Sequence, residues 1–423
     1  MVKKESGCRV KGVGCRIKPF SIARIFFTIA YTLYPIPCLF GYTSLGYNYS
    51  GDIIYGYSAR SVGMGCSSIA IADDSSAIFT NPACLTNIVA KYFQLSVSNA
   101  AVLFSDRWAP GSIKNNPSYY QFNEVSIAAK LPLGFAVGYG FSPLLNYSFD
   151  YADNFYDRTE LIYQERTDGA GNLWSHQLGL AWQATDRFTV GFAYTILNGE
   201  RERKYYDKFF IYPYTKKENQ TLDGDSQIYG FLYRYNQMKF GGYYKSKAPV
   251  DYKLTTTEDY TGYGGEIYSD TASGTDNLPE SFGLGFSCRF KGKMSPLFTI
   301  ETNHTNWHGV WSGYSNTNDI RLGFEHFLNE WFALRYGFYT YNFYYKWDRY
   351  ERNWYYGTWD IQEIDPRFYF FTFGSGVKFP LVEADIGYEF GKRAYSTKAT
   401  TSSSEVRTDE IFQRIMLTAR YRW

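Results

Sequence analysis

Beyond its first 41 residues the chain lacks any long apolar run, and it also lacks an excess of basic charge. No later stretch approaches the roughly 18 consecutive apolar residues of a membrane-spanning helix, and the mean hydropathy is −0.36. The 43 Lys and Arg are matched by 41 Asp and Glu, whereas a nucleic-acid-binding surface needs a basic excess. These absences exclude a spanning helix beyond residue 41 and argue against a nucleic-acid partner.

Aromatic residues, in contrast, are abundant: 42 Tyr, 34 Phe and 10 Trp make up 20% of the 423 residues. An ordinary soluble core needs fewer, which implies that a large surface of the protein meets an apolar environment. A transmembrane β-barrel combines such a surface with a low mean hydropathy, because only every second residue of each strand faces lipid.

The N-terminal residues have the pattern of an export signal. Several basic residues precede an apolar stretch from Ile25 to Phe40, which two prolines interrupt. We predict a signal peptide over residues 1–41, although no small-residue cleavage site precedes Tyr42. A buried strand or a membrane anchor is the alternative, but an anchor normally needs about 20 unbroken apolar residues.

Past residue 90, apolar residues alternate with small or polar ones, which is the period of a β-strand. From Phe188 to Ile196, aromatic and branched side chains on one face oppose threonine, glycine and alanine on the other. The small faces carry glycine and isolated charges, which suits an enclosed lumen better than a solvated exterior. We therefore expect the apolar faces to point outward; Phe192, Leu284 and Leu322 packed in an interior core would contradict this.

The expected fold class is all-β, a transmembrane antiparallel β-barrel of about fourteen strands. We place the strands near residues 91–104, 121–131, 133–147, 174–184, 187–197, 226–236, 237–250, 280–290, 295–308, 318–327, 330–343, 368–379, 380–390 and 410–423. Tight links alternate with long polar ones, such as 148–173, 198–225 and 251–279. Short periplasmic turns with long outer loops are typical of outer-membrane barrels, and an even strand count returns both termini to the periplasm.

The C-terminal residues favour the same location. Tyr421 and Trp423 share a strand face with Ile415 and Leu417. An aromatic final residue on the lipid face resembles the signal that the barrel-assembly machinery reads. We therefore expect that machinery and outer-membrane lipid among the partners.

The segment from Ala59 to Leu85 resembles the hatch of the FadL-like long-chain fatty-acid transporters. The matching residues are Gly63, Gly65, Asp73, Asp74, Asn81, Pro82 and Ala83. Stretches within 278–286, 320–337 and 365–374 are also similar to that family. The resemblance implies a hatch over residues 42–90 inside a barrel over residues 91–423. It also implies passive uptake of long-chain fatty acids or other hydrophobic small molecules, and no cofactor.

Locally, the expected hatch contains signals for short helices. Asp73 or Asp74 can cap a brief helix from Ser75 to Phe79, and Pro82 ends it. Small residues let such a segment fold inside a barrel rather than join its wall. A generic helix and turn in front of a sheet is the alternative.

Two cysteines fall within the expected hatch. Cys66 and Cys84 stand where the resembling family usually has glycine, and the compartment is oxidising. We predict a disulfide between them, with two small buried side chains as the alternative. The histidines lack the spacing of a metal site and no Ser-His-Asp spacing suggests a hydrolase, so we predict neither a metal nor catalysis.

Charged residues on the lumen faces are expected mainly to form ion pairs across the lumen or to the hatch. A sharper hypothesis is that Arg335 and Arg367 receive a fatty-acid carboxylate. A guanidinium can hold a carboxylate through two parallel hydrogen bonds.

The third expected strand could be broken locally. It presents Gly138, Gly140 and Ser142 inward, followed by Pro143, and both glycine and proline permit a bulge. The family resemblance implies a kink here that opens the wall sideways toward the bilayer. Residues 144–146 lack the glycine that follows the proline in that family, so an ordinary strand end is the alternative.

Two functions fit this sequence. In the first, outer loops capture a hydrophobic molecule, the lumen holds it, the hatch shifts, and the ligand leaves sideways. In the second, the barrel is a protein-interaction, secretion-accessory or adhesin platform, for which tyrosine-rich loops such as 341–356 are suited. In either case we expect a monomer in the bacterial outer membrane, with loops exposed at the cell surface.

Overall fold

The computed structural model describes residues 51–107, 112–115, 118–157, 160–209, 212–292, 294–310, 312, 314–342, 359–360, 367–399 and 405–423. The expected signal peptide, residues 42–50 of the expected hatch and most of the 341–356 stretch lie outside these residues. No helix in the described ranges is both long enough and apolar enough to cross a membrane.

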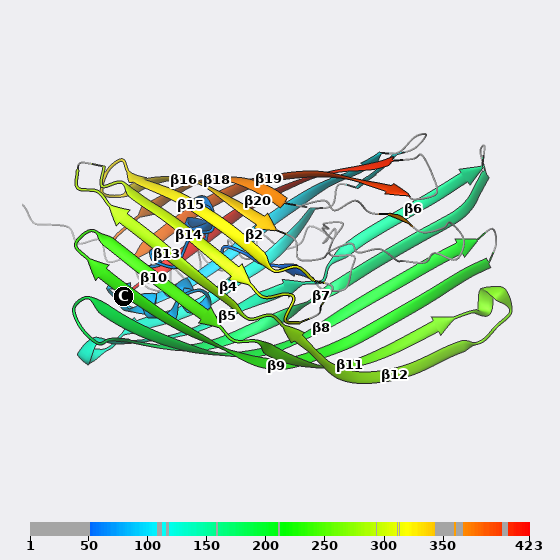
Figure 1. Ribbon diagram of the computed structural model, residues 1–423, viewed down its shortest axis with the longest axis horizontal. Helices are drawn as coiled ribbons and strands as arrows, with labels where there is room; N and C mark the ends of the chain where they lie inside the picture. Colours follow the sequence, from blue (N-terminus) through cyan, green and yellow to red (C-terminus); the bar gives the residue numbers. More distant parts are fainter. Residues whose placement is uncertain are drawn as a thin grey trace, which may run out of the picture. The chain divides into compact units, whose positions relative to one another are not determined.

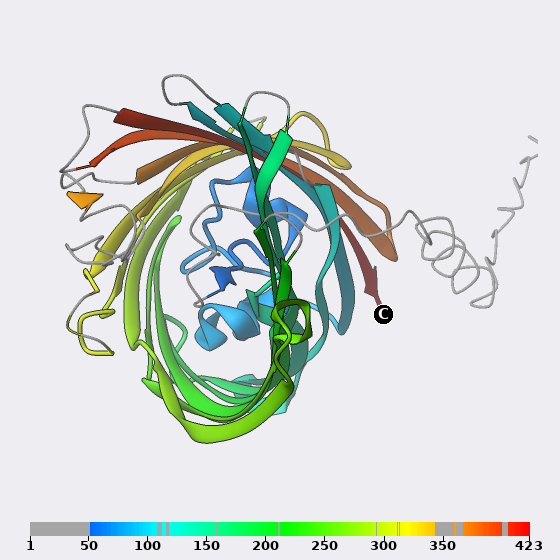
Figure 2. The same cartoon turned by 90° about the vertical axis from the view of Figure 1, so that its right-hand side faces the viewer.

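Fourteen antiparallel strands form a closed barrel, which confirms the predicted fold class (Figures 1 and 2). Around the barrel they are β2 (Tyr92–Arg107), β4 (Ser118–Lys130), β5 (Phe135–Asn146), β7 (Glu160–Gln183), β8 (Phe188–Phe209), β9 (Tyr212–Tyr235), β10 (Met238–Lys245), β13 (Ser281–Arg289), β14 (Leu297–Thr305), β15 (Thr317–Phe327), β16 (Phe332–Asn342), β18 (Arg367–Lys378), β19 (Val382–Ala399) and β20 (Glu405–Arg422). Pairing of β20 with β2 closes the ring.

The alternating faces have the predicted orientation. Phe192 is 39% exposed and Leu284 is 53% exposed on the outside of the barrel, whereas Thr189 and Thr195 are buried within it. Burial of one small face and exposure of one apolar face is the pattern of a barrel whose outer surface meets lipid.

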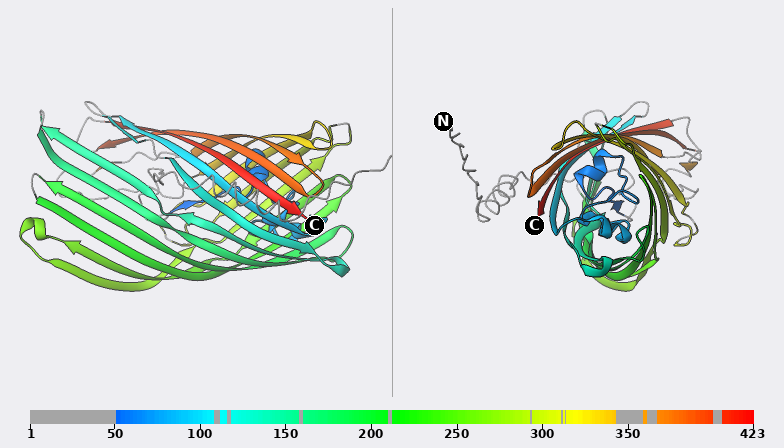
Figure 3. Two further views of the ribbon diagram at one scale, coloured as in Figure 1. Left: turned by 180° about the vertical axis from the view of Figure 1, so that it is seen from behind. Right: turned by 90° about the vertical axis from the view of Figure 1, so that its left-hand side faces the viewer.

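The wall is much taller on one side than on the other. The ladders between β7, β8 and β9 continue far beyond the ends of the strands on the opposite side of the barrel (Figures 1 and 3). Three further strands extend the same side: β6 (Phe149–Asp157), β11 (Ala248–Asp259) and β12 (Ile267–Leu278). Large parts of 148–173, 198–225 and 251–279, which we expected to be loops, are therefore strands. Their polar composition conceals the ladder, because the outer face of this extension lacks the row of apolar residues that marks a strand in lipid.

Residues 51–90, here called the inner segment, lie within the ring of strands (blue in Figure 2). They contain β1 (Asp52–Ile53), α2 (Ala59–Gly63) and the short 3-10 helices η2 (Ser75–Phe79) and η3 (Pro82–Asn87). The remaining short elements are β3 (Ser112–Asn115), η4 (Pro132–Gly134), η5 (Thr261–Tyr263) and β17 (Trp359–Asp360).

Candidate functional site

Side-chain caps shape the inner segment locally. The Asp74 carboxylate accepts a hydrogen bond from the Ser76 N–H at 3.0 Å at the start of η2. The Asn81 side chain accepts one from the Ala83 N–H at 3.1 Å at the start of η3, which begins at Pro82. Of the two aspartates considered for the first cap, Asp74 therefore makes it, because its backbone is extended as an N-cap requires.

A belt of wall glycines makes room for the inner segment. A Cβ atom at any of them would come within 3.3 Å of an atom of that segment. The belt consists of Gly138, Gly140, Gly179, Gly191, Gly230, Gly241, Gly285, Gly323, Gly337, Gly374 and Gly387. On the inner side, Gly65 (φ +66°) and Gly63 press against strand backbone in the same way. Backbone therefore touches backbone around much of the barrel, and this contact holds the segment in one position.

Buried ion pairs add to this attachment. Arg60 of α2 donates to Glu325 of β15 from Nε at 2.9 Å and also pairs with Asp73. Arg335 of β16 donates to the same Glu325 at 2.9 Å and to Asp385 at 2.6 Å. Burial by itself raises the pKa of Asp73, but the positive charges of Arg60, Arg420 and Lys378 together outweigh it, and the pKa of that carboxyl is lowered.

These contacts reassign Arg335. Its guanidinium is almost fully buried and already holds two carboxylates, so it belongs to the network around the inner segment and does not offer a free receptor for a ligand. Arg367, at the start of β18, donates from Nε to Asn342 Oδ1 at 2.7 Å. The partners of these two arginines lie far away in the chain, so they could not be deduced from the sequence.

A second arginine ties the segment to the C-terminal strand. Arg420 of β20 donates to Asp74 at 3.1 Å, to Glu383 at 2.6 Å and to Asp385 at 3.2 Å. Tyr421 and Trp423 lie beyond it with stacked rings 5.7 Å apart, and Trp423 is exposed. The use of these aromatic rings as an assembly signal stays a prediction.

The predicted disulfide is wrong, because Cys66 and Cys84 are both free thiols. Cys66 packs among aromatic side chains of β16 and β18, whereas Cys84 belongs to another buried cluster and donates to the Ile69 carbonyl at 3.2 Å. Burial raises the pKa of each thiol to about 12, so both stay protonated and unreactive at neutral pH. The spacing of the two cysteines in the sequence could not show that the inner segment folds so that they lie in different buried clusters.

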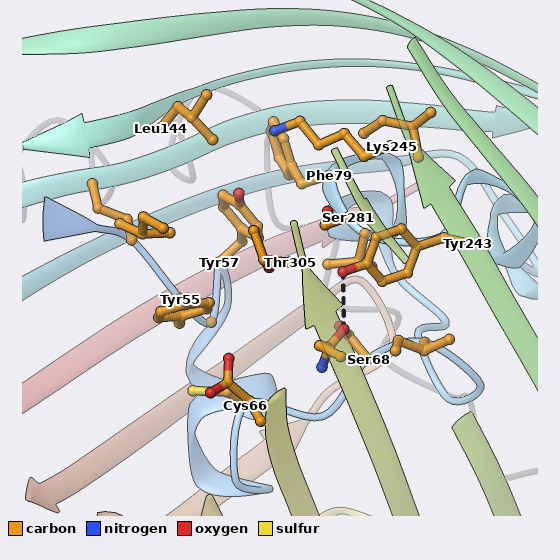
Figure 4. A pocket seen from close by; sticks show the side chains of 18 of the residues that line it. Tyr55, Tyr57, Cys66, Ser68, Phe79, Leu144, Tyr243, Lys245, Ser281 and Thr305 are labelled. Atoms are coloured by element: carbon orange, nitrogen blue, oxygen red, sulfur yellow. Dashed lines mark hydrogen bonds between the residues drawn. The ribbon is translucent and has the colours of Figure 1, made fainter. Parts of the chain in front are cut away.

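A cavity lies beside the first residues of the inner segment, with about 990 Å³ of open space, part of it in contact with solvent. Its lining is mixed: Leu144, Phe79 and Trp307 are apolar, and Tyr57 and Tyr243 add rings with hydroxyl groups (Figure 4). The Tyr243 hydroxyl donates to Asn303 at 2.9 Å. A second cavity of about 600 Å³ lies across Ile53–Tyr55 and is lined mainly by aromatic rings. A concave lining that combines apolar side chains and aromatic rings with several polar groups suits a small molecule that is largely apolar and has a polar end.

Lys245, at the end of β10, is among the side chains that line the larger cavity (Figure 4). Among the described residues, none forms a hydrogen bond or an ion pair with its ammonium group. Arg321, the other cation in the lining, is engaged: it donates to the Cys66 carbonyl at 3.0 Å and lies over the Tyr55 ring. Sequence analysis missed Lys245, because an isolated lysine at a strand end carries no signal until the cavity is known.

The wall changes its pairing next to this cavity. Strand β4 pairs with β5 only from Val125 to Lys130, which leaves the β5 edge from Ser142 onward without β4. The two residues of β1 take part of this place, with Ile53 opposite Leu145, and the Ile54 N–H donates to the Leu144 carbonyl at 3.3 Å. Inner segment and wall are therefore joined by strand pairing here.

Strand β5 is irregular at the same point. Its register against β7 shifts between Pro143 and Leu145, so the sequence expectation of a break falls on an observed bulge. Gly138 and Gly140 lie earlier in β5, against Leu85 and Phe79 of the inner segment. Phe141 forms an aromatic cluster with Phe122 and Trp174, with ring centroids 5.0–6.2 Å apart. A lateral opening at this place stays a prediction.

Comparison with known proteins supplies a family and a fold. A protein-family model described as BamG matches residues 51–264, half of the chain. No curated protein matches. The chain is similar to the solved Pseudomonas putida toluene transporter TodX, with a TM-score of 0.64 at 13% identity, over 88% of this chain and 99% of that one.

Two other solved structures show the same likeness. A Pseudomonas aeruginosa FadL homologue has a TM-score of 0.66 at 13% identity, over 88% of this chain and 100% of that one. The Ralstonia pickettii toluene transporter TbuX has a TM-score of 0.57 at 13% identity, over 89% and 100%. At such low identity the likeness shows a shared fold, which is FadL-like.

Proposed function

The chain belongs to the BamG family, and from this premise and its FadL-like fold we propose that it is an outer-membrane channel for a hydrophobic small molecule. The observation that carries the proposal is the cavity that adjoins the part of the β5 edge where β4 no longer pairs and only the short β1 takes its place. The solved structures of TodX and TbuX, which have a similar fold, are named as transporters of toluene, and this supports the proposal.

The path we propose runs from the outer end of the barrel into the cavity and out between β4 and β5. Strand β1 lies across this exit, because it pairs with Leu145 and Asn146. Residues 59–87 press on the wall glycines and are anchored by Arg60 and Arg420, so we infer that they stay in place. The movement expected of the hatch is thereby confined to residues 52–57.

A disulfide between β1 and β5 tests this path. Ile53 and Leu145 are opposite each other, and the neighbouring bond from Ile54 to Leu144 makes theirs the closer, non-hydrogen-bonded kind of pair. The variant Ile53→Cys/Leu145→Cys, with Cys66, Cys84 and Cys288 changed to Ala, is expected to lose oleate uptake at least tenfold when oxidised. Reduction should restore uptake. The measurement is entry of radiolabelled oleate into cells that lack their own fatty-acid channel.

Each single-cysteine variant, oxidised and reduced in parallel, is the control for the tether and should transport as the parent does. If the oxidised double variant still takes up oleate at the parent rate, residues 52–57 do not gate an exit and the proposed path is wrong.

Lys245 defines the expected ligand within this proposal, an amphipathic carboxylate such as a long-chain fatty acid. We expect its ammonium group to bind the carboxylate while the apolar lining takes the chain. Loss of a hydrogen bond to a charged group costs about 1.5–3 kcal/mol, roughly a tenfold change or more. Lys245→Met should therefore weaken oleate uptake about tenfold and leave toluene uptake unchanged, whereas Lys245→Arg should keep both. An equal loss for the two compounds would contradict this role.

A second candidate function is a platform for other proteins at the cell surface. The observation that favours it is the one-sided wall of β6 to β9, β11 and β12, most of which extends beyond the strands of the shorter side and does not line the cavity.

A further inference from the structure

The outermost strand of the tall wall has an open edge. Strand β12 pairs along its whole length with β11, from Ala248 opposite Leu278 to Asp259 opposite Ile267. No described strand pairs with its other edge. Nearly all of its side chains are exposed, and Figure 1 shows the strand running along the outside of the extended wall. The backbone groups on that edge are therefore available to another chain.

The register indicates which residues present these groups. The Tyr260 N–H donates to the Glu266 carbonyl at 3.3 Å, next to the hairpin turn. Because backbone groups alternate along an antiparallel pair, even-numbered residues of β12 bond to β11 and odd-numbered ones face the open edge. The Thr271 N–H is consistent with this alternation, because it donates to the Asp270 side chain at 2.8 Å and not to β11. Ser269, Ser273, Thr275 and Asn277 share its orientation.

The open edge lacks most of the features that normally prevent strand addition. Natural edge strands are protected by charged side chains, above all lysine, by proline or by a bulge. Ile267–Leu278 contains no lysine or proline, and its only charges are Asp270 and Asp276, which repel an acidic strand but attract a basic one. The pairing of β11 with β12 also keeps one register throughout. Aromatic contacts hold the tip of the hairpin, with Tyr212 stacked on Tyr263 at 5.4 Å and Tyr260 beside Tyr268. The edge is therefore long, regular and held in place.

The hairpin is also strongly acidic. Residues 251–278 contain a single basic residue, Lys253, against six acidic ones: Asp251, Glu258, Asp259, Glu266, Asp270 and Asp276. A second copy of this chain would bring an equally acidic edge against the first, and like charges on paired strands repel. The same charge attracts a basic strand.

We propose that the open edge of β12 is a docking site for an extended, basic segment of a partner protein, which adds a strand to the wall. Main-chain hydrogen bonds to the odd-numbered residues supply affinity, and the acidic hairpin selects a partner rich in Lys or Arg. This inference does not depend on transport, because Leu278, at the end of β12 away from the hairpin tip, is the only residue of β12 that lines the cavity.

The test uses the full-length protein in phosphatidylcholine nanodiscs and a fluorescent ten-residue peptide of alternating Lys and Thr, with fluorescence anisotropy as the readout. We expect saturable binding that weakens at high salt, no binding to empty nanodiscs, and none of a Glu–Thr peptide. N-methylation of every second amide of the Lys–Thr peptide, on the bonding edge, should weaken binding at least tenfold. Absence of binding, or equal binding of the N-methylated peptide, would overturn the proposal.

A matched pair of variants locates the site. Ser273→Pro removes one N–H from the open edge, where proline is tolerated, and should weaken peptide binding at least fivefold. Ser273→Ala keeps that N–H and should bind as the parent does. Both variants should keep the gel mobility of the folded barrel before and after heating, which shows that they are folded by a readout that does not rely on the transport proposal. Equal peptide binding by the two variants would place the peptide elsewhere and overturn the assignment to β12.

Discussion

Replacing Gly241 by valine is expected to expel the inner segment from the barrel, whereas the same change at Gly242 should leave the molecule folded. A Cβ at Gly241 would lie 2.5 Å from the Ile69 carbonyl oxygen and 3.2 Å from the Ala70 Cα, which are backbone atoms that cannot turn aside. At Gly242 it would meet the ends of the Phe231 and Leu284 side chains on the outer face, which can move. Overpacking of a tight interior costs about 1–3 kcal/mol and more where backbone is displaced.

The measurement is limited proteolysis of the protein in detergent, combined with the gel mobility of folded and heat-denatured samples. The Gly241→Val protein should be cut within residues 51–90 at least tenfold faster than the parent. Gly242→Val, adjacent in the chain and identical in chemistry, should be as resistant as the parent. Equal resistance of both variants would show that the belt of wall glycines does not hold the segment.

Glu325→Ala is expected to lower the free energy of unfolding by about 3–5 kcal/mol, because it removes the acceptor for two buried guanidinium groups, those of Arg60 and Arg335. Glu325 is fully buried and accepts hydrogen bonds from Arg60, Arg335 and Arg289 at 2.9–3.2 Å. Its removal leaves positive charge in the barrel without its shared counter-ion. The measurement is the urea midpoint of the folded band in detergent, with the exposed Glu266→Ala as the control that should not shift.

The double variant Glu325→Ala/Arg60→Met gives this prediction a sharper form. Removing one of the guanidinium groups along with its partner should recover part of the lost stability, because a buried charge without a partner is the main cost. If the double variant is less stable by the sum of both single losses, Glu325 and Arg60 do not act as a pair.

The two effects together give the physical reason for our proposal that only part of the expected hatch moves. Residues 59–87 meet the wall through backbone contacts and buried charge pairs, which are costly to break. Residues 52–57 have a short strand pairing at Leu145 and Asn146, and they lie between two cavities. Motion that admits a ligand is expected where the fewest of these contacts must be broken.

Much of the barrel could be predicted, and particular residues show why. The alternation around Phe192 predicted which face of the strand points outward. With a two-residue period all apolar side chains of a strand lie on one face, and in a barrel surrounded by lipid that face is the outer one. The tall wall was missed because Thr, Lys and Glu in 198–225 are as common in a loop as in a strand whose outer face meets water. The pairing of Arg335 and the separation of Cys66 from Cys84 depend on contacts between residues far apart in the chain.

By itself the sequence determined the class of fold, the number of strands and the side of each strand that faces out, because these follow from local periodicity and turn spacing. Only the tertiary structure decided what lies against the inner segment, where the cavity and Lys245 meet, and which strand edge stays open. These depend on the closure of the ring, which brings into contact residues that no local pattern relates.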